Sequence, residues 1–352
     1  MHDETGYIAG PDGRVWWRSM GEGDGLPLLV LHGGPGAASY YVEPFAERMA
    51  AHRRVVIFDQ LGCGRSDKPD APSLWTWDRA IAEVDLVRRE LDLGTTAIMG
   101  QSWGGWLSIE YLCRGTTGVA AVILASTSSS IPQFTAEAAR LIDELPEPAR
   151  TTLKELGARG AYDDPAYGEA VMEFYVRHLC RVDPWPECVV KTANELDGNQ
   201  VYLTMNGPTE FDVIGEPLRD WDRTADLGRI TIPTLITCGR HDEITPACSA
   251  TIQAGVPQAR MVVFEHSAHC SHEEEPERYA AVAEEFLAGV VCLAVPIRDA
   301  SGQLAAALAI SAPAARLTIK KAMQQIPVMM STAQKLGEQI SNRKQSLQQL
   351  AT

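Results

Sequence analysis

The sequence has little that would place this chain in a membrane, in a disulfide-stabilised fold or on a nucleic acid. No apolar run reaches the roughly 18 residues that a membrane helix needs. The acidic start, residues 1–4, lacks the apolar stretch of a signal peptide, so we expect a cytoplasmic protein. The eight cysteines are scattered without C-x-x-C pairs or metal-ligand spacing, so we expect reduced thiols, no metal and no other cofactor. A net charge of −15 disfavours nucleic acids and anionic membranes as partners and is compatible with cationic substrates.

The distribution of apolar residues indicates a large globular α/β fold. The chain has 352 residues, of which 45% are apolar, enough to bury a sizeable core. Residues 1–126 alternate short apolar runs with helical patterns, which predicts a parallel sheet built from β-α units. Residues 127–225 are rich in Glu, Ala, Leu and Arg with breaks at prolines, which predicts an inserted lid of short helices. Strand and helix patterns resume over residues 226–289, and we expect this segment to complete the sheet.

The most informative motif is Gly-Gln-Ser-Trp-Gly at residues 100–104, a G-x-S-x-G pattern. It follows an apolar run at residues 96–99 and precedes a helical pattern, which is the context of the nucleophile elbow of α/β-hydrolases. In that turn the serine hydroxyl is presented at the top of the sheet, and a Cβ at either glycine would clash with neighbouring backbone. We therefore predict Ser102 as the nucleophile, although the pentapeptide alone is also compatible with an ordinary Gly-rich turn.

A second Gly-rich segment, His-Gly-Gly-Pro-Gly at residues 32–36, follows the apolar run 28–31. A tetrahedral intermediate needs two N–H donors for its oxyanion. In α/β-hydrolases one donor is the residue after the nucleophile, and the other lies in a loop of this kind. The predicted oxyanion donors are thus the amides of Trp103 and Gly34, with His32 as a structural residue of the loop.

Asp242 and His269 are the predicted partners of Ser102. A serine becomes nucleophilic when an imidazole accepts its proton, and that imidazole needs a carboxylate to orient it. The α/β-hydrolase order is Ser, acid, His. Asp242 follows the predicted strand 232–239, and His269 follows the predicted strand 261–264.

Two other histidines compete with His269 for the role of base, His266 and His272. We favour His269 because Ser-Ala-His at residues 267–269, ahead of Glu-Pro-Glu at residues 275–277, resembles the loop before the last helix in this fold. The final core helix is expected to begin near Pro276, since proline suits the first helical turn.

Residues from about 6 to 288 resemble the proline iminopeptidase family of α/β-hydrolases. The loop at residues 32–36 is shared, and Phe-Asp-Gln-Leu-Gly-Cys-Gly-Arg-Ser at residues 58–66 is a specific mark of the family. Segments at residues 141–146, 205–211 and 242–246 are similar to its branch of tricorn-interacting aminopeptidase factors. The resemblance implies a serine aminopeptidase that releases N-terminal residues, proline or other apolar ones, from short peptides.

The resemblance also implies residues that bind the substrate. A free N-terminal ammonium is costly to bury unless carboxylates meet it. This role falls to Glu210 and Glu243, for which the alternatives are a solvated lid residue and a turn charge. Tyr202 is a candidate for an added hydrogen bond, or an aromatic core residue. Aromatic residues that could line an apolar pocket, or simply pack the lid, are Phe174, Tyr175, Trp185 and Trp221.

The last segment, residues 290–352, does not belong to the hydrolase pattern. Two apolar runs around a Gly-containing turn predict a hairpin. A helical stretch from about residue 318, interrupted or begun afresh at Pro327, follows the hairpin. One stripe of this stretch carries Met329, Ala333, Leu336, Ile340 and Leu347.

This tail resembles the end of the effector-binding domain of IclR-type regulators, at residues 294–299 and 308–313. The rest of that domain and any DNA-binding helix-turn-helix are missing from the sequence. Because a lone hairpin leaves edges and an apolar face unburied, we expect it to dock on the hydrolase, to pair with another chain in a homo-oligomer, or to fluctuate.

The sequence as a whole predicts an α/β-hydrolase fold, a mostly parallel sheet flanked by helices, with a helical lid and a C-terminal hairpin-helix appendage. The predicted function is a serine aminopeptidase acting on short peptides or amino-acid amides with a free amine. The main alternative is an amino-acid amidase or esterase with the same triad. A non-catalytic ligand-binding or regulatory protein is suggested by the tail alone, and an aspartate nucleophile is excluded by Ser102.

Overall fold

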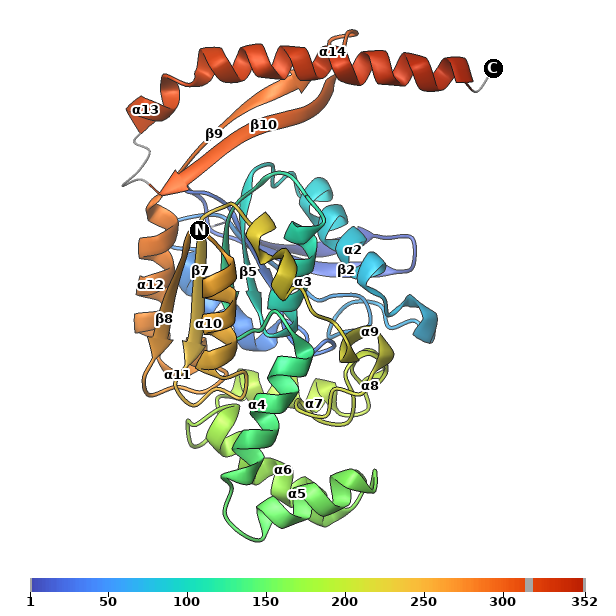
Figure 1. Ribbon diagram of the computed structural model, residues 1–352, viewed down its shortest axis with the longest axis vertical. Helices are drawn as coiled ribbons and strands as arrows, with labels where there is room; N and C mark the ends of the chain where they lie inside the picture. The colour runs from blue at the N-terminus through green and yellow to red at the C-terminus, as the bar shows by residue number, and fades with distance from the viewer. Residues whose placement is uncertain (1, 314–318, 351–352) are drawn as a thin grey trace.

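The computed structural model describes residues 2–313 and 319–350 and contains an eight-stranded sheet (Figure 1). The spatial order is β1-β2-β4-β3-β5-β6-β7-β8. The edge strand β1 pairs antiparallel with β2, β2 pairs antiparallel with β4, and the other pairs of this sheet are parallel. The strands are β1 (Asp3–Ala9), β2 (Arg14–Met20), β3 (Leu28–Leu31), β4 (Val55–Phe58), β5 (Thr96–Gln101), β6 (Val119–Ala125), β7 (Thr234–Gly239) and β8 (Ala259–Phe264).

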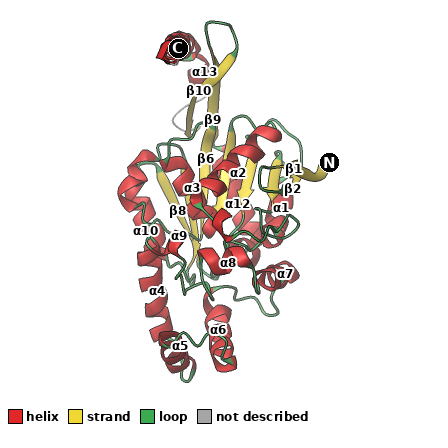
Figure 2. Ribbon diagram, turned by 90° about the vertical axis from the view of Figure 1, so that its right-hand side faces the viewer, coloured by secondary structure: helices red, strands yellow, loops and turns green. Residues whose placement is uncertain are grey.

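The central strands are continuous apolar runs because helices cover both faces of the sheet. Every residue of β3 and β4 is buried, and alternate residues enter different apolar clusters. Leu29 and Leu31 pack with α2 (Trp77–Glu90), α3 (Trp103–Cys113) and α10 (Pro246–Gly255). On the other face, Leu28 and Val30 pack with α1 (Glu43–Met49) and α12 (Pro276–Ala288). Figure 1 shows α12 on one side of the sheet and α10 and α3 on the other, and Figure 2 gives the view turned by 90°.

The chain leaves the sheet after β6 and returns at β7, and the intervening helices form the lid. Figure 1 places α5 and α6 farthest from the sheet. Two of the proline breaks mark helix starts, because Pro165 is the first residue of one helix and Pro186 precedes another. The lid elements are α4 (Ile131–Asp143), α5 (Ala149–Ala158), α6 (Pro165–His178), α7 (Glu187–Leu196), α8 (Gln200–Met205), α9 (Glu216–Arg219) and the 3-10 turn η3 (Thr224–Arg229).

A buried carboxylate fastens the end of the lid to the core. Glu110 of α3 accepts hydrogen bonds from Trp221 Nε1 at 3.0 Å and from Arg223 Nε at 2.6 Å. Arg114 Nε donates to the same carboxylate at 2.8 Å. Because these donors compensate the burial of the charge, the returning segment is held against α3, the helix that begins directly after Ser102.

The tail projects from the end of the sheet opposite the lid (Figure 1). Strands β9 (Val290–Arg298) and β10 (Leu304–Pro313) form an antiparallel hairpin, and the helices α13 (Ile319–Met323) and α14 (Ile326–Leu350) follow. Only Gly289 separates α12 from β9. Among the described residues, no helix is both long and apolar enough to span a membrane, α14 included.

The apolar face of the hairpin is covered by the chain's own helix α14. The predicted stripe packs there, with Met329 and Ala333 buried against Val295 and Ile297 in a cluster separate from the two core clusters. A Cβ on Gly337 would lie 2.0 Å from the Arg298 carbonyl oxygen, so a glycine is needed where helix and strand meet. Leu336 and Ile340 also contact this cluster, whereas the side chain of Leu347 lies outside the described residues.

Candidate active site

Ser102 lies in a strained turn between β5 and α3. Its backbone has φ 53° and ψ −119°, a conformation that costs a non-glycine residue about 1–3 kcal/mol and is typical of functional sites. The Ser102 N–H donates to the Ala125 carbonyl at 2.9 Å, which fixes the turn to the end of β6. The serine is thus held at the carboxyl edge of the sheet.

Two glycines allow the backbone to pack at this turn, as predicted. A Cβ on Gly100 would lie 2.1 Å from the Gly104 carbonyl oxygen. A Cβ on Gly104 would lie 2.2 Å from the Leu31 carbonyl oxygen. Since backbone atoms cannot yield to such contacts, any larger residue would displace α3 from β3.

The loop at residues 32–36 is held by the buried ring of His32. Its Nδ1 lies 2.9 Å from the Gly33 carbonyl oxygen, and its Nε2 accepts from the Gln60 N–H at 3.1 Å. The Nδ1 therefore carries the proton, and His32 supports the loop as predicted. Because C=O and N–H of a trans peptide point in opposite directions, this bond aims the Gly34 N–H away from His32. Gly34 has φ 105°, which favours glycine.

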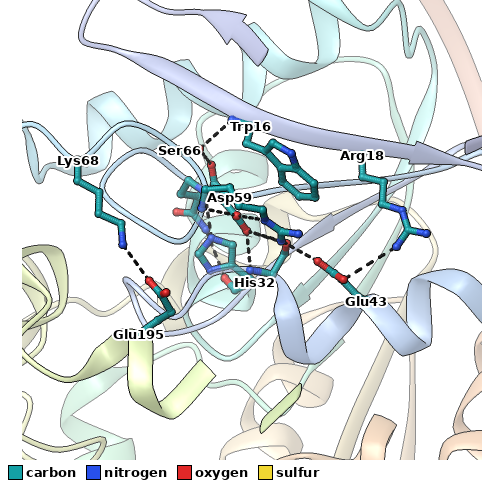
Figure 3. A network of polar contacts seen from close by, with 11 residues as sticks. Trp16, Arg18, His32, Glu43, Asp59, Ser66, Lys68 and Glu195 are labelled. Carbon is teal, nitrogen blue, oxygen red and sulfur yellow. Dashed lines mark hydrogen bonds and ion pairs between the residues drawn. The ribbon is translucent and has the colours of Figure 1, made fainter. Parts of the chain in front are cut away.

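The family motif at residues 58–66 supports the same loop (Figure 3). The buried Asp59 carboxylate accepts from the Ser39 N–H at 2.8 Å and from Arg65 Nε at 2.7 Å. Burial opposes ionisation, but the Arg65 guanidinium holds the pKa of Asp59 below its usual value. At the lid side of the network, Lys68 Nζ lies 2.9 Å from the carboxylate of Glu195 on α7.

Asp242 and His269, which follow β7 and β8, contact each other, and His269 lines the same pocket as Ser102. His269 Nδ1 lies 2.8 Å from Asp242 Oδ1, and both side chains are buried. The same carboxylate oxygen accepts from the Ile244 N–H at 2.9 Å, which fixes its orientation. With Nδ1 directed to the carboxylate, Nε2 of His269 is left to accept a proton.

The two alternative histidines lie elsewhere. His266 is exposed on the surface. His272 is buried against the rings of Tyr41 and Tyr279, and burial lowers its pKa to about 3. Neither histidine lines the pocket that contains Ser102.

That pocket lies between the sheet edge and the lid. One wall carries Ser102, His269 and Gly34. The opposite wall is largely apolar and comes from the lid. Its residues are Leu179, Trp185, Val189, Thr192, Ala193, Leu196 and Glu210.

Two further carboxylates surround the histidine. Glu210 lines the pocket, its N–H donates to the Tyr175 hydroxyl at 3.0 Å, and its carboxylate accepts from Tyr202. Glu243 is 1% exposed, and its Oε1 lies 3.9 Å from His269 Nε2. Its Oε2 has no hydrogen-bond partner within the described residues. Burial raises the pKa of both glutamates, because a charged carboxylate is costly there.

The remaining predicted residues take different positions. Tyr202 lies behind Glu210 and is not one of the residues lining the pocket. Trp185 lines the pocket, whereas Phe174 packs against Phe211 in the lid. Trp221 stacks on Trp77, at a centroid distance of 5.3 Å, next to the Glu110 bonds. Tyr175 supports Glu210 through its hydroxyl group.

Sequence analysis missed two contributors to the pocket. The first is Tyr41, which has no sequence motif of its own. The second is the stripe of Val189, Thr192, Ala193 and Leu196 on α7. Its i, i+3, i+4, i+7 spacing predicts an amphipathic helix, but not that its inner face borders the pocket.

Similarity to known proteins agrees with this architecture. Residues 27–276 match the family described as alpha/beta hydrolase fold. The chain is therefore an α/β-hydrolase. Residues 275–341 match the family described as bacterial transcriptional regulator IclR C-terminal.

More specific relatives narrow the family. Proline iminopeptidase of Saccharolobus solfataricus is 38% identical over 77% of this chain and 88% of its own length. Proline iminopeptidase of Heyndrickxia coagulans is 36% identical over 80% of this chain and 98% of its own length. The crystal structure of proline iminopeptidase from Mycobacterium smegmatis is 34% identical with a TM-score of 0.75, over 81% and 98%. The crystal structure of VinJ is 36% identical with a TM-score of 0.78, also over 81% and 98%.

The chain belongs to the proline iminopeptidase family and is a serine hydrolase of the prolyl aminopeptidase type.

The cluster of carboxylates predicts an unusual titration for His269. Burial alone would lower its pKa, but Asp242, Glu243 and Glu210 together raise it to about 9. Replacing Glu243 with Gln removes one buried negative charge, so the His269 pKa should fall by about one pH unit. An NMR titration of labelled histidine, assigned with His269→Gln, measures it. The matched control is Glu144→Gln on the surface of the lid. An equal pKa of His269 in the wild type and both variants would show that Glu243 is uncharged or too far from His269 to affect it.

Proposed function

We propose that this protein releases single N-terminal residues, proline or other apolar ones, from short peptides through an acyl-enzyme on Ser102. The observation that supports this most is the shared pocket, which is lined by Ser102, His269 and Glu210. A nucleophile, a base and a cation-binding group in one pocket suit a substrate whose reacting carbonyl lies close to a free ammonium. We also propose that the protein acts in the cytoplasm.

The first half of the reaction follows from the arrangement around His269. Ser102 Oγ attacks the carbonyl carbon of the first peptide bond while His269 Nε2 takes the hydroxyl proton. Asp242 keeps the imidazole in the required tautomer and stabilises the imidazolium. The N–H groups of Gly34 and Trp103 bind the oxyanion of the tetrahedral intermediate.

The second half releases both products. His269 gives its proton to the nitrogen of the leaving peptide, the C–N bond breaks, and the N-terminal residue stays as an ester on Ser102. Water then attacks this ester with His269 again as base. The amino acid leaves, and Ser102 regains its proton.

Glu210 and Glu243 hold the substrate ammonium in this scheme. Both carboxylates lie next to His269 where burial disfavours their charged form, and a bound cation would restore that form. The same cation offsets the negative field at His269, and this lowers the pKa of the imidazole towards the working range of a base. With the ammonium held in the pocket that Ser102 lines, one residue would lie between the amine and the reacting carbonyl, so cleavage would be limited to the first peptide bond.

The lid wall favours an apolar side chain. Trp185, Val189 and Leu196 present hydrocarbon surface to the pocket, and a pyrrolidine ring or an aliphatic side chain would bury its surface there. A charged side chain next to Trp185, Val189 and Leu196 would lose its hydration without gaining a partner among them.

The nucleophile can be tested with Ser102→Ala. Turnover of an aminoacyl-naphthylamide should fall roughly 10⁶-fold, since such losses follow removal of a catalytic serine. The unfolding midpoint in urea should stay close to that of the wild type. The exposed Ser73→Ala serves as a control with full activity, and near-normal turnover by purified Ser102→Ala would refute the assignment.

The ammonium site can be tested with Glu210→Gln. Loss of one partner of a buried ion pair costs about 3–5 kcal/mol, so kcat/KM for free-amine substrates should fall at least about 100-fold. Hydrolysis of a simple acyl ester without an amine should change little, and Glu169→Gln on the lid surface should behave like the wild type. Equal losses on both substrates would mean that Glu210 supports the lid and does not bind the amine.

A panel of aminoacyl-naphthylamides, amino-acid amides and acyl esters distinguishes a peptidase from an amidase or esterase.

The tail can be tested by ending the chain at Gly289. Its apolar cluster is separate from the core, and the proposed catalytic and ammonium-binding residues all precede it. We therefore expect the shortened protein to fold and to keep its aminopeptidase activity. Light scattering on both forms tests whether the tail forms a homo-oligomer, which a change from dimer to monomer would support. Loss of activity in a soluble, monodisperse shortened protein would contradict the claim that the tail is dispensable.

A further inference from the structure

A buried tyrosine connects the Gly-rich loop to the nucleophile turn. Tyr41 lies in the 3-10 turn η1 (Tyr40–Val42) and is 5% exposed. Its hydroxyl accepts from the Gly33 N–H at 2.6 Å and donates to the side-chain oxygen of Gln101. Burial raises the pKa of Tyr41 well above its usual value, so the phenol keeps its proton and remains a donor.

Gln101 extends this connection to the histidine loop. It is the last residue of β5 and directly precedes Ser102. Its Nε2 donates to the carbonyl oxygen of His269 at 3.4 Å, a long hydrogen bond. One line of side chains therefore runs from Gly33 through Tyr41 and Gln101 to the backbone of His269.

The absence of a side chain at residue 33 follows from the same contacts. A Cβ on Gly33 would lie 2.7 Å from the Tyr41 hydroxyl and 2.7 Å from Gln101 Oε1. It would also lie 3.1 Å from the Cβ of Ser102. A glycine is therefore required at residue 33, because the Tyr41 and Gln101 side chains occupy the space where a Cβ would lie.

We propose that Tyr41 and Gln101 are positioning residues that keep the oxyanion loop, the Ser102 turn and the His269 loop in register during the reaction. The inference rests on the proposed roles of Gly34, Ser102 and His269. Each of the three loops follows a different strand. The short chain of hydrogen bonds connects the oxyanion loop with the Ser102 turn, and the Ser102 turn with the His269 loop. The oxyanion forms only after attack by Ser102. A less well positioned loop should therefore reduce stabilisation of the transition state more than it reduces binding of the substrate.

The test compares kcat and KM in Tyr41→Phe, Gln101→Leu and the double variant. Tyr41→Phe keeps the ring that lines the pocket but leaves the Gly33 N–H and the Gln101 carbonyl unpaired. Losing a direct oxyanion donor costs about 10²–10³ in kcat, so this indirect change should lower kcat roughly 10- to 100-fold with KM within about threefold. The decrease should hold across the whole pH range, since the substitution removes no charge. If both residues act through one line, the double variant should be no slower than the slower single variant.

The matched control is Tyr279→Phe. Tyr279 is also buried, and its hydroxyl lies 2.8 Å from the Thr237 hydroxyl of β7 rather than from a group of the three loops. It should lose stability without losing kcat. Unchanged kcat in Tyr41→Phe and Gln101→Leu, a loss confined to KM, or an equal loss in Tyr279→Phe would overturn the inference.

The assay uses both an aminoacyl-naphthylamide and an acyl ester, with Ser102→Ala alongside. A decrease in kcat on the ester alone, with no activity on the naphthylamide, would support positioning while rejecting the aminopeptidase proposal. An active Ser102→Ala would reject the proposed function itself. Gln101→Leu keeps the test decisive if Tyr41→Phe does not fold.

Discussion

The parallel direction of six neighbouring strands is the constraint on which the rest of this molecule depends. In a parallel sheet all carboxyl ends lie at one edge, and ligand sites form in the crevice outside that edge. The Gly-rich loop follows β3, Ser102 follows β5, Asp242 follows β7 and His269 follows β8. Residues separated by more than 230 positions are thereby brought to one pocket. The lid, inserted between β6 and β7, closes that pocket from the same side.

Enclosure has an electrostatic consequence. Once the lid excludes water, Glu243 and Glu210 cannot be solvated as surface carboxylates are, and their charge acts on His269 through a medium of low dielectric constant. The imidazole responds with a raised pKa, and the glutamates respond in the same direction. A substrate ammonium bound as proposed would favour the charged form of both glutamates and would lower the pKa of His269. In the proposed function, recognition of the amine and the basicity of His269 therefore follow from one charge distribution.

The sequence predicted those parts of the structure that have a local signature. The fully buried strands β3 and β4 coincide with their apolar runs, because burial on both faces leaves no polar residues to blur the pattern. The need for glycine at residues 100 and 104 could be predicted, because the crowding of backbone atoms at this turn arises within a short sequence motif. Tyr41 was not, since its importance arises from contacts with Gly33 and Gln101 that only the folded chain creates. The covering of the hairpin by α14 was likewise open, because an amphipathic stripe does not specify which surface it will meet.

The single-residue junction between α12 and β9 has a consequence for how the molecule could be enlarged. The helix α12 runs from the lid edge of the sheet to the opposite edge, and the hairpin begins there after Gly289 alone (Figure 1). The amino ends of the parallel strands carry none of the proposed reactive loops, so a segment attached at this edge is separated from the pocket by the length of the sheet. The molecule thus has its proposed chemistry at one end and its appended segment at the other. A partner that binds the hairpin and helix would therefore contact the end of the molecule opposite the mouth of the pocket.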